Sequence, residues 1–180
     1  NEGIKAYHDN DMMRDGAIPN QSLLKKEHEG LIKILNKHFL DTVSIPFEGG
    51  LEKNKKYDFV FMRDHFLCNT NREIVMCNMK LFERMNEGVF TISYLENLNY
   101  NISYLDEDCV AEGGEFFYLS KENILLAGQN RNNLKGAEQM AEKLNVSNLF
   151  IINSRGYHLD TSIAPLFNSE YDCIGIICAK

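Results

Sequence analysis

Acidic residues and one histidine occur in three short segments of the chain. The segments are Phe61-Met62-Arg63-Asp64, Glu112-Gly113-Gly114-Glu115 and His158-Leu159-Asp160. Carboxylates form charge-assisted, paired hydrogen bonds to a planar cation such as a guanidinium. A histidine close to them moves protons near neutral pH. Together these residue types predict a site that binds a guanidinium and transfers protons on it.

An acid precedes a strand, a polar turn and a second strand at three places. The acids are Asp64, Glu115 and Asp160, which lie 51 and 45 residues apart. Two apolar runs separated by a short polar turn are typical of a β-hairpin. A spacing of this size is typical of repeat proteins, in which one supersecondary unit recurs. We therefore expect three related hairpins that place their acids at equivalent positions.

Helices and single strands are expected between the hairpins. Apolar residues recur at helical spacing in some segments, and others are short, continuous apolar runs. The predicted helices cover about 23–35, 82–99 and 134–144, and the predicted single strands cover 42–45, 100–104 and 148–152. The repeating unit is therefore strand, strand, helix, strand.

The repeats predict how the domain is organised. They divide the chain into a half repeat (1–57), two whole repeats (58–106 and 107–157) and a terminal hairpin (158–180). Units of this kind bury their apolar faces by stacking on one another or by closing into a ring. Since the chain begins without methionine and ends where a further helix is expected, we expect one incomplete α/β domain. A missing C-terminal segment or an oligomer would complete it.

The three acidic segments resemble motifs of the guanidino-modifying family, which comprises arginine deiminases, dimethylarginine dimethylaminohydrolases and amidinotransferases. Residues 61–64 resemble its Phe-x-Arg-Asp motif, and 158–160 resemble its His-x-Asp motif. Residues 112–115 resemble its Glu-Gly-Gly-Asp motif, with glutamate in the last place. The segment 129–132 resembles the arginine-containing start of the helix that follows. The resemblance implies a pentein, an α/β propeller of five ββαβ repeats, of which this chain would hold a part.

The resemblance also implies covalent catalysis at the guanidinium carbon of arginine or an arginine derivative. Asp64 and Asp160 would bind the substrate's nitrogens, and Glu115 would add a contact. His158 would protonate the leaving amine and then activate water. Glu112 would orient His158 and favour its protonated form.

Three more residues complete the site that the resemblance implies. Arg84 and Arg131 would either bind the α-carboxylate of the substrate or brace the acidic cluster, and Asp58 would line the same pocket. Because Asp160 needs free N–H groups to accept from, an unmethylated guanidinium is favoured. Deimination, double hydrolysis to ornithine and amidino transfer share the first half-reaction, and all three stay open.

The family's cysteine nucleophile has no counterpart in this sequence. The five cysteines are Cys68, Cys77, Cys109, Cys173 and Cys178, and none has the family's glycine-rich surroundings. A cysteine in an apolar strand is by default an inert thiol. We therefore expect the nucleophile to come from outside these residues. The alternative is a catalytically inactive pentein that binds a cationic ligand or a protein partner.

Composition limits the partners and the compartment. A net charge of −7 argues against nucleic acid as a partner, and no apolar run is long enough to suggest a membrane span. Five cysteines without paired spacing favour a reducing, cytoplasmic setting. No His and Cys spacing suggests zinc, and no phosphate-binding loop is present. We therefore expect a small cationic guanidino substrate and neither a metal nor a cofactor.

Overall fold

The computed structural model describes residues 20–38, 42–47, 49–154 and 157–179. The chain divides between Tyr57 and Asp58 into two compact units, and each is described by itself. In the first unit, α2 spans Gln21–His38 and α3 spans Gly50–Lys53. The helix expected over 23–35 is therefore confirmed.

The strand expected at 42–45 is wrong. These residues have no regular secondary structure and pair with none of the strands that the structure describes. A strand is stable when its backbone N–H and C=O groups pair with a neighbouring strand. Pro46, which follows directly, carries no N–H to donate to a ladder.

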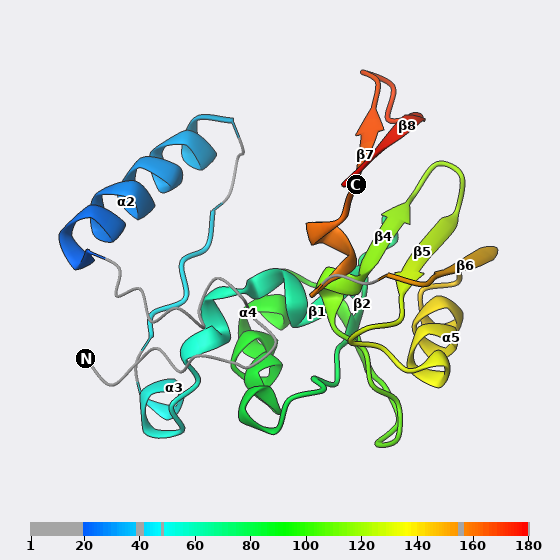
Figure 1. Ribbon diagram of the computed structural model, residues 1–180. Coiled ribbons are helices and arrows are strands. Elements are labelled where there is room, and N and C mark those ends of the chain that lie inside the picture. The colour runs from blue at the N-terminus through cyan, green and yellow to red at the C-terminus, as the bar shows by residue number, and fades with distance from the viewer. Residues whose placement is uncertain (1–19, 39–41, 48, 155–156, 180) are drawn as a thin grey trace. The chain divides into compact units, whose positions relative to one another are not determined.

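The second unit holds three small sheets (Figure 1). The first contains β1 (Phe66–Cys68), β2 (Glu73–Met76) and β3 (Asn101–Tyr104); the second contains β4 (Phe116–Leu119), β5 (Ile124–Gly128) and β6 (Asn148–Ile152); the third contains β7 (Ile163–Phe167) and β8 (Cys173–Cys178). In the first two sheets an antiparallel hairpin is joined by a parallel third strand. The third sheet is an antiparallel hairpin.

This topology confirms the three expected hairpins and an α/β fold of small sheets. The order strand, strand, helix, strand occurs twice, with α4 (Ile92–Asn97) before β3 and α5 (Leu134–Lys143) before β6. The described strands form three separate sheets rather than one closed sheet. The five-bladed propeller therefore stays a prediction.

The segment expected to be one helix over 82–99 is broken. It contains two 3₁₀ turns, Phe82–Arg84 and Glu87–Thr91, followed by α4. Between the turns, Asn86 adopts a left-handed conformation with φ 63°. Arg84 and Glu87 on either side of it are buried and paired with each other. Arg84 also contacts Asp64, and Glu87 also contacts His65, and these tertiary contacts override the weak helical pattern of the segment.

The largest apolar core joins the first two repeats. Val75 of β2 packs in the same cluster as Phe116 of β4 and Leu125 of β5. Ala137 and Met140 of α5 cover this cluster, and Figure 1 shows α5 beside the second sheet. The acidic segments lie at the ends of the two hairpins, and this packing fixes the positions of those ends relative to each other.

The start of α5 is capped by its own sequence. The side chain of Asn133 accepts a hydrogen bond from the N–H of Gly136 at 2.7 Å, which satisfies one of the free donors of the first turn.

None of the described helices is both long enough and apolar enough to cross a membrane.

Candidate active site

Three 3₁₀ turns bring the acidic segments together. They span Met62–Asp64, Gly113–Glu115 and Leu159–Thr161, and each lies just before the first strand of its sheet. The turn at Gly113–Glu115 contacts both of the others. Because each turn has the same place in its repeat, side chains from distant parts of the sequence meet.

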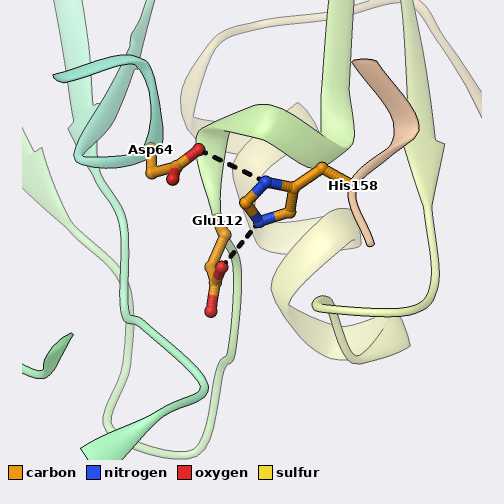
Figure 2. Close-up of side chains that lie close together, drawn as sticks. All are labelled: Asp64, Glu112 and His158. Carbon is orange, nitrogen blue, oxygen red and sulfur yellow. Dashed lines mark hydrogen bonds and ion pairs between the residues drawn. The ribbon is translucent and has the colours of Figure 1, made fainter. Parts of the chain in front are cut away.

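His158 lies between two carboxylates (Figure 2). Its Nε2 is 2.7 Å from Oε2 of Glu112, and its Nδ1 is 3.7 Å from Oδ1 of Asp64. All three side chains are buried. The hydrogen bond to Glu112 fixes the orientation of the imidazole ring and leaves Nδ1 directed toward Asp64.

The surroundings of His158 favour the imidazolium. Burial by itself lowers the pKa of His158, because it penalises the charged form. The hydrogen bond to Glu112 and the charges of Asp64, Glu112 and Asp160 outweigh burial, so the pKa is raised above its ordinary value. For Glu112, burial raises the pKa, but the bonds from His158 and from the backbone N–H of Lys80 hold it below its ordinary value. The two groups therefore form a charged, buried pair.

Two buried arginines flank the acidic cluster. The Nη1 of Arg84 donates to Oδ2 of Asp64 at 2.8 Å. The Nη1 of Arg131 lies 4.0 Å from Oε1 of Glu112. The guanidinium carbon of Arg131 lies over the ring of Tyr157, 4.3 Å from the ring centroid. Both side chains are buried. Of the two roles predicted for Arg84 and Arg131, these contacts favour bracing of the acidic cluster.

Glu115 is held by backbone groups. Its Oε1 accepts from the N–H of Arg131 at 2.6 Å, and its Oε2 accepts from the N–H of Leu159 at 3.0 Å. Burial raises the pKa of this carboxyl. Glu115 has no exposed surface, and both of its carboxylate oxygens accept backbone hydrogen bonds. A direct contact of Glu115 with substrate stays a prediction.

Asp160 is the most exposed of the expected acids. Its side chain is 26% exposed, and its Oδ2 accepts from Nε of Arg63 at 2.7 Å. The same arginine donates through Nη2 to the carbonyl of Phe116 at 2.6 Å. Arg63 therefore links the turns that precede the three hairpins. Asp58 lies deeper, with Oδ2 3.9 Å from Nε of Arg84.

The sequence analysis missed two buried residues next to this site. Glu87 accepts from Nε of Arg84 at 3.0 Å, and Nε2 of His65 lies 3.5 Å from the same Glu87 oxygen. Glu87 falls in the segment that was expected to be one continuous helix. His65 stands directly after the Phe61–Asp64 motif, which is the only signal in the sequence that could have found it.

The structure also matches solved structures of guanidino-modifying enzymes. No protein-family model and no curated protein sequence matches the chain. AgrE, in a ternary complex with ornithine and NAD⁺, aligns with a TM-score of 0.70 at 25% identity, over 83% of this chain and 21% of AgrE. The N-terminal domain of ArgZ, an arginine dihydrolase from Cyanobacteria, aligns with a TM-score of 0.74 at 23% identity, over 89% of this chain and 58% of that chain.

A dimethylarginine dimethylaminohydrolase, as an adduct with S-methyl-L-thiocitrulline, aligns with a TM-score of 0.70 at 18% identity, over 90% of this chain and 60% of that chain. The resemblance to the guanidino-modifying pentein family is confirmed. The chain spans less than two thirds of the length of each of these penteins.

Three of the five thiols of the chain do not have the surroundings of an activated nucleophile. Burial and the charges of Asp64 and Glu112 raise the pKa of Cys77 well above its ordinary value. Burial also raises the pKa of Cys68, and Cys109 is fully buried. Since the thiolate is the attacking form, these neutral thiols are poor nucleophiles.

The carboxylates and imidazole of this site also have the spacing of metal ligands. Atoms of Asp64, Glu112 and His158 lie within 4.8 Å of one another. The Nη1 of Arg84 is 2.8 Å from Asp64 and 4.0 Å from Glu112, so a guanidinium already balances their charge. That the site takes no metal stays a prediction.

The pair Gly113-Gly114 is required by close packing in this site. A Cβ on Gly114 would lie 2.7 Å from Nδ1 of His158 and 2.8 Å from Oδ1 of Asp64. Gly114→Ala is therefore expected to push the two groups apart and lower turnover about 10²-fold, because a misplacement near 1 Å has an effect of that size. Gly175→Ala in β8 is the matched control, since a Cβ there meets nothing within 4 Å. Equal turnover of the two variants in a steady-state assay would contradict this packing.

The raised pKa of His158 predicts how stability depends on pH. A group with a raised folded pKa stabilises the fold fully below its unfolded pKa, here about 6.5, and loses this contribution as pH rises through the folded value. The thermal midpoint of the wild type should fall relative to that of His158→Asn as the pH rises above about 6.5 and through the folded pKa. A difference between the two midpoints that is constant over this range would show that His158 is not a charged partner of Glu112.

Proposed function

We propose that this chain supplies the guanidinium-binding and proton-transfer groups of a site that acts on arginine or an arginine derivative. The observation that carries the proposal is the buried His158, held 2.7 Å from Glu112 and 3.7 Å from Asp64. Two buried carboxylates around one imidazole suit a planar, cationic substrate. The imidazole can protonate the leaving nitrogen of such a substrate as its bond to carbon breaks.

Asp64 keeps capacity to bind the substrate. An ionised carboxylate offers about four lone-pair positions. The N–H donors from Arg84 and Gly114 use two of them, at 2.8 and 3.1 Å. The remaining positions would accept N–H groups of the guanidinium. The partly exposed Asp160 would accept from a second nitrogen, which favours an unmethylated substrate.

His158 would carry the proton in both half-reactions. Its Nε2 is bound to Glu112, so Nδ1 is the nitrogen that delivers the proton. As the bond between the guanidinium carbon and the leaving nitrogen breaks, the Nδ1 proton would pass to that nitrogen. The neutral Nδ1 would then take a proton from the water that attacks the covalent intermediate.

The covalent intermediate would form on a cysteine outside these 180 residues. This part of the proposal rests on the poor surroundings of the thiols described above. It is supported by structures of relatives: the N-terminal domain of ArgZ was crystallised with a covalently bound reaction intermediate. AgrE was crystallised with L-arginine after a cysteine was replaced by alanine.

Calorimetric titration with arginine tests the proposed function. Arginine is expected to bind to the chain, and Asp64→Asn is expected to weaken binding by about 2–5 kcal/mol, because it removes the charged partner of a buried cation. Citrulline has the same shape with a neutral ureido group and serves as the matched ligand. The proposal fails if citrulline binds as well as arginine, or if Asp64→Asn leaves the affinity for arginine unchanged.

A second candidate is a catalytically inactive pentein that binds a cationic ligand or a protein. The raised pKa of Cys77, the one thiol whose pKa responds to both Asp64 and Glu112, favours it. Such a protein would bind arginine yet show no product from any form of the protein. Release of citrulline, ornithine or ammonia from arginine would rule it out.

A further inference from the structure

The buried charges of the site extend beyond the groups that face His158. Glu87 lies three residues after Arg84 and is 1% exposed. Its Oε2 is 3.0 Å from Nε of Arg84 and 3.5 Å from Nε2 of His65. We propose that Glu87 is a positioning residue, which fixes the guanidinium of Arg84 and, through it, the carboxylate of Asp64.

Two strong contacts at different edges fix the guanidinium of Arg84. A guanidinium is planar, and its donors form a rigid fork, so bonds at two edges set its orientation. Glu87 binds the Nε edge at 3.0 Å, and Asp64 binds Nη1 at 2.8 Å. The contacts to Asp58 are longer, 3.9 Å to its carboxylate and 3.4 Å to its carbonyl. Without Glu87 the plane would pivot about its bond to Asp64.

The orientation of Arg84 decides how Asp64 faces the site. Arg84 occupies Oδ2 of Asp64. This leaves Oδ1 to accept from the N–H of Gly114 at 3.1 Å and to face Nδ1 of His158 at 3.7 Å. A rotation of the Arg84 guanidinium would move the bound Oδ2 of Asp64. Oδ1 of Asp64 would then rotate away from Nδ1 of His158. Glu87 therefore acts on His158 through a chain of two buried contacts.

Charged and titratable groups surround Glu87 and Arg84 from several elements. They are His65 beside Glu87, and Asp58, Asp64 and Glu112 beside Arg84. The ring of His65 is fully buried and stacks on Phe59 with a centroid distance of 4.9 Å. Among the described residues, its ring nitrogens make no hydrogen bond. His65 therefore packs against Glu87 and does not compete with Arg84 for a hydrogen bond to the Glu87 carboxylate.

The inference rests on the proposed function in one respect: Glu87 affects substrate binding only if Asp64 binds the substrate guanidinium, as proposed. Its test needs no turnover. Nuclear magnetic resonance on the full chain would follow the Nε–H of Arg84 and the titration of the His158 ring. Glu87→Ala is expected to speed exchange of the Arg84 Nε–H with water roughly tenfold or more. It should also lower the pKa of His158, because Oδ1 of Asp64 would turn away from Nδ1 and contribute less to the raised value.

Two further variants separate positioning from a general loss of stability. Glu87→Gln keeps an acceptor oxygen, so the Arg84 Nε–H should stay protected and the His158 pKa should stay closer to that of the wild type than in Glu87→Ala. Leu144→Ala removes a buried core side chain away from the site, which destabilises the fold without touching these charges. It should change neither signal.

Two results would overturn the proposal. One is an Arg84 Nε–H that stays protected in Glu87→Ala, and the other is a His158 pKa that is equal in Glu87→Ala and the wild type. If the alanine variant does not fold, Glu87→Asp takes its place, because it keeps the charge but withdraws the carboxylate from Nε of Arg84, and the same two results would overturn the proposal. Titration of the same samples with arginine keeps the two claims apart. A wild type that does not bind arginine argues against the proposed function and leaves the Glu87 result standing.

Discussion

Replacing His158 by alanine is expected to lower turnover of arginine roughly 10²–10⁴-fold while the protein stays folded. The reason is that, in the proposed function, Nδ1 of His158 gives a proton to the leaving nitrogen and then takes one from water. No other group in the described site is placed to take its role, since Asp64 and Glu112 are carboxylates paired with arginines. The measurement is steady-state release of ammonia, citrulline or ornithine, made on the smallest form of the protein that turns over arginine.

The control for this variant is another histidine on the same chain. His28 is exposed on α2, so His28→Ala is expected to leave turnover unchanged. Circular dichroism would show that both variants are folded. Unchanged turnover in His158→Ala would remove His158 from the chemistry and leave the binding-protein alternative in front.

Arg84→Ala is expected to destabilise the protein by about 3–5 kcal/mol. Arg84 is buried between the carboxylates of Asp64 and Glu87, at 2.8 and 3.0 Å. Removing its charge leaves two buried carboxylates facing each other without a cation. Buried charges without partners are strongly unfavourable. Equilibrium unfolding in urea measures the loss directly.

The matched control is a cation in an exposed ion pair. Lys135 contacts Asp108 at the surface of the same unit, and both side chains are more than half exposed. Lys135→Ala should therefore leave the unfolding free energy without measurable change, because exposed pairs contribute little. A similarly small effect of Arg84→Ala would show that the acidic cluster is solvated rather than buried.

The hairpins and α5 could be predicted because their signals are local. The strands near Glu115 are short apolar runs around a polar turn, and α5 has its own cap in Asn133. The acids that precede the hairpins occupy equivalent turns, so the repeat also predicted that Asp64 and His158 would meet.

The broken segment between Phe82 and Asn97 could not be predicted, because tertiary contacts decide it. Arg84 and Glu87 sit at helical spacing, which favours one helix in isolation. Their burial against Asp64 and His65 imposes a different backbone, with Asn86 left-handed. For the same reason the sequence offered no sign that Glu87 belongs to the site.

The role of each acid depends on details that spacing does not contain. Glu115 and Glu112 lie in one motif, yet Glu115 binds two backbone N–H groups and Glu112 binds an imidazole. The motif located both carboxylates, but only the structure shows that their hydrogen-bond partners differ. The remaining assignments, including the contact of Asp160 with substrate, stay predictions.

The central claim is that a guanidinium enters the site of His158, and one titration tests it most directly. Arginine would be added to the chain while the ring signals of His158 are followed by nuclear magnetic resonance. The expected result is a saturable change of the His158 signals with arginine, absent with citrulline and lost in Asp64→Asn. His158 signals that stay unchanged up to millimolar arginine, or that respond equally to citrulline, would contradict the claim.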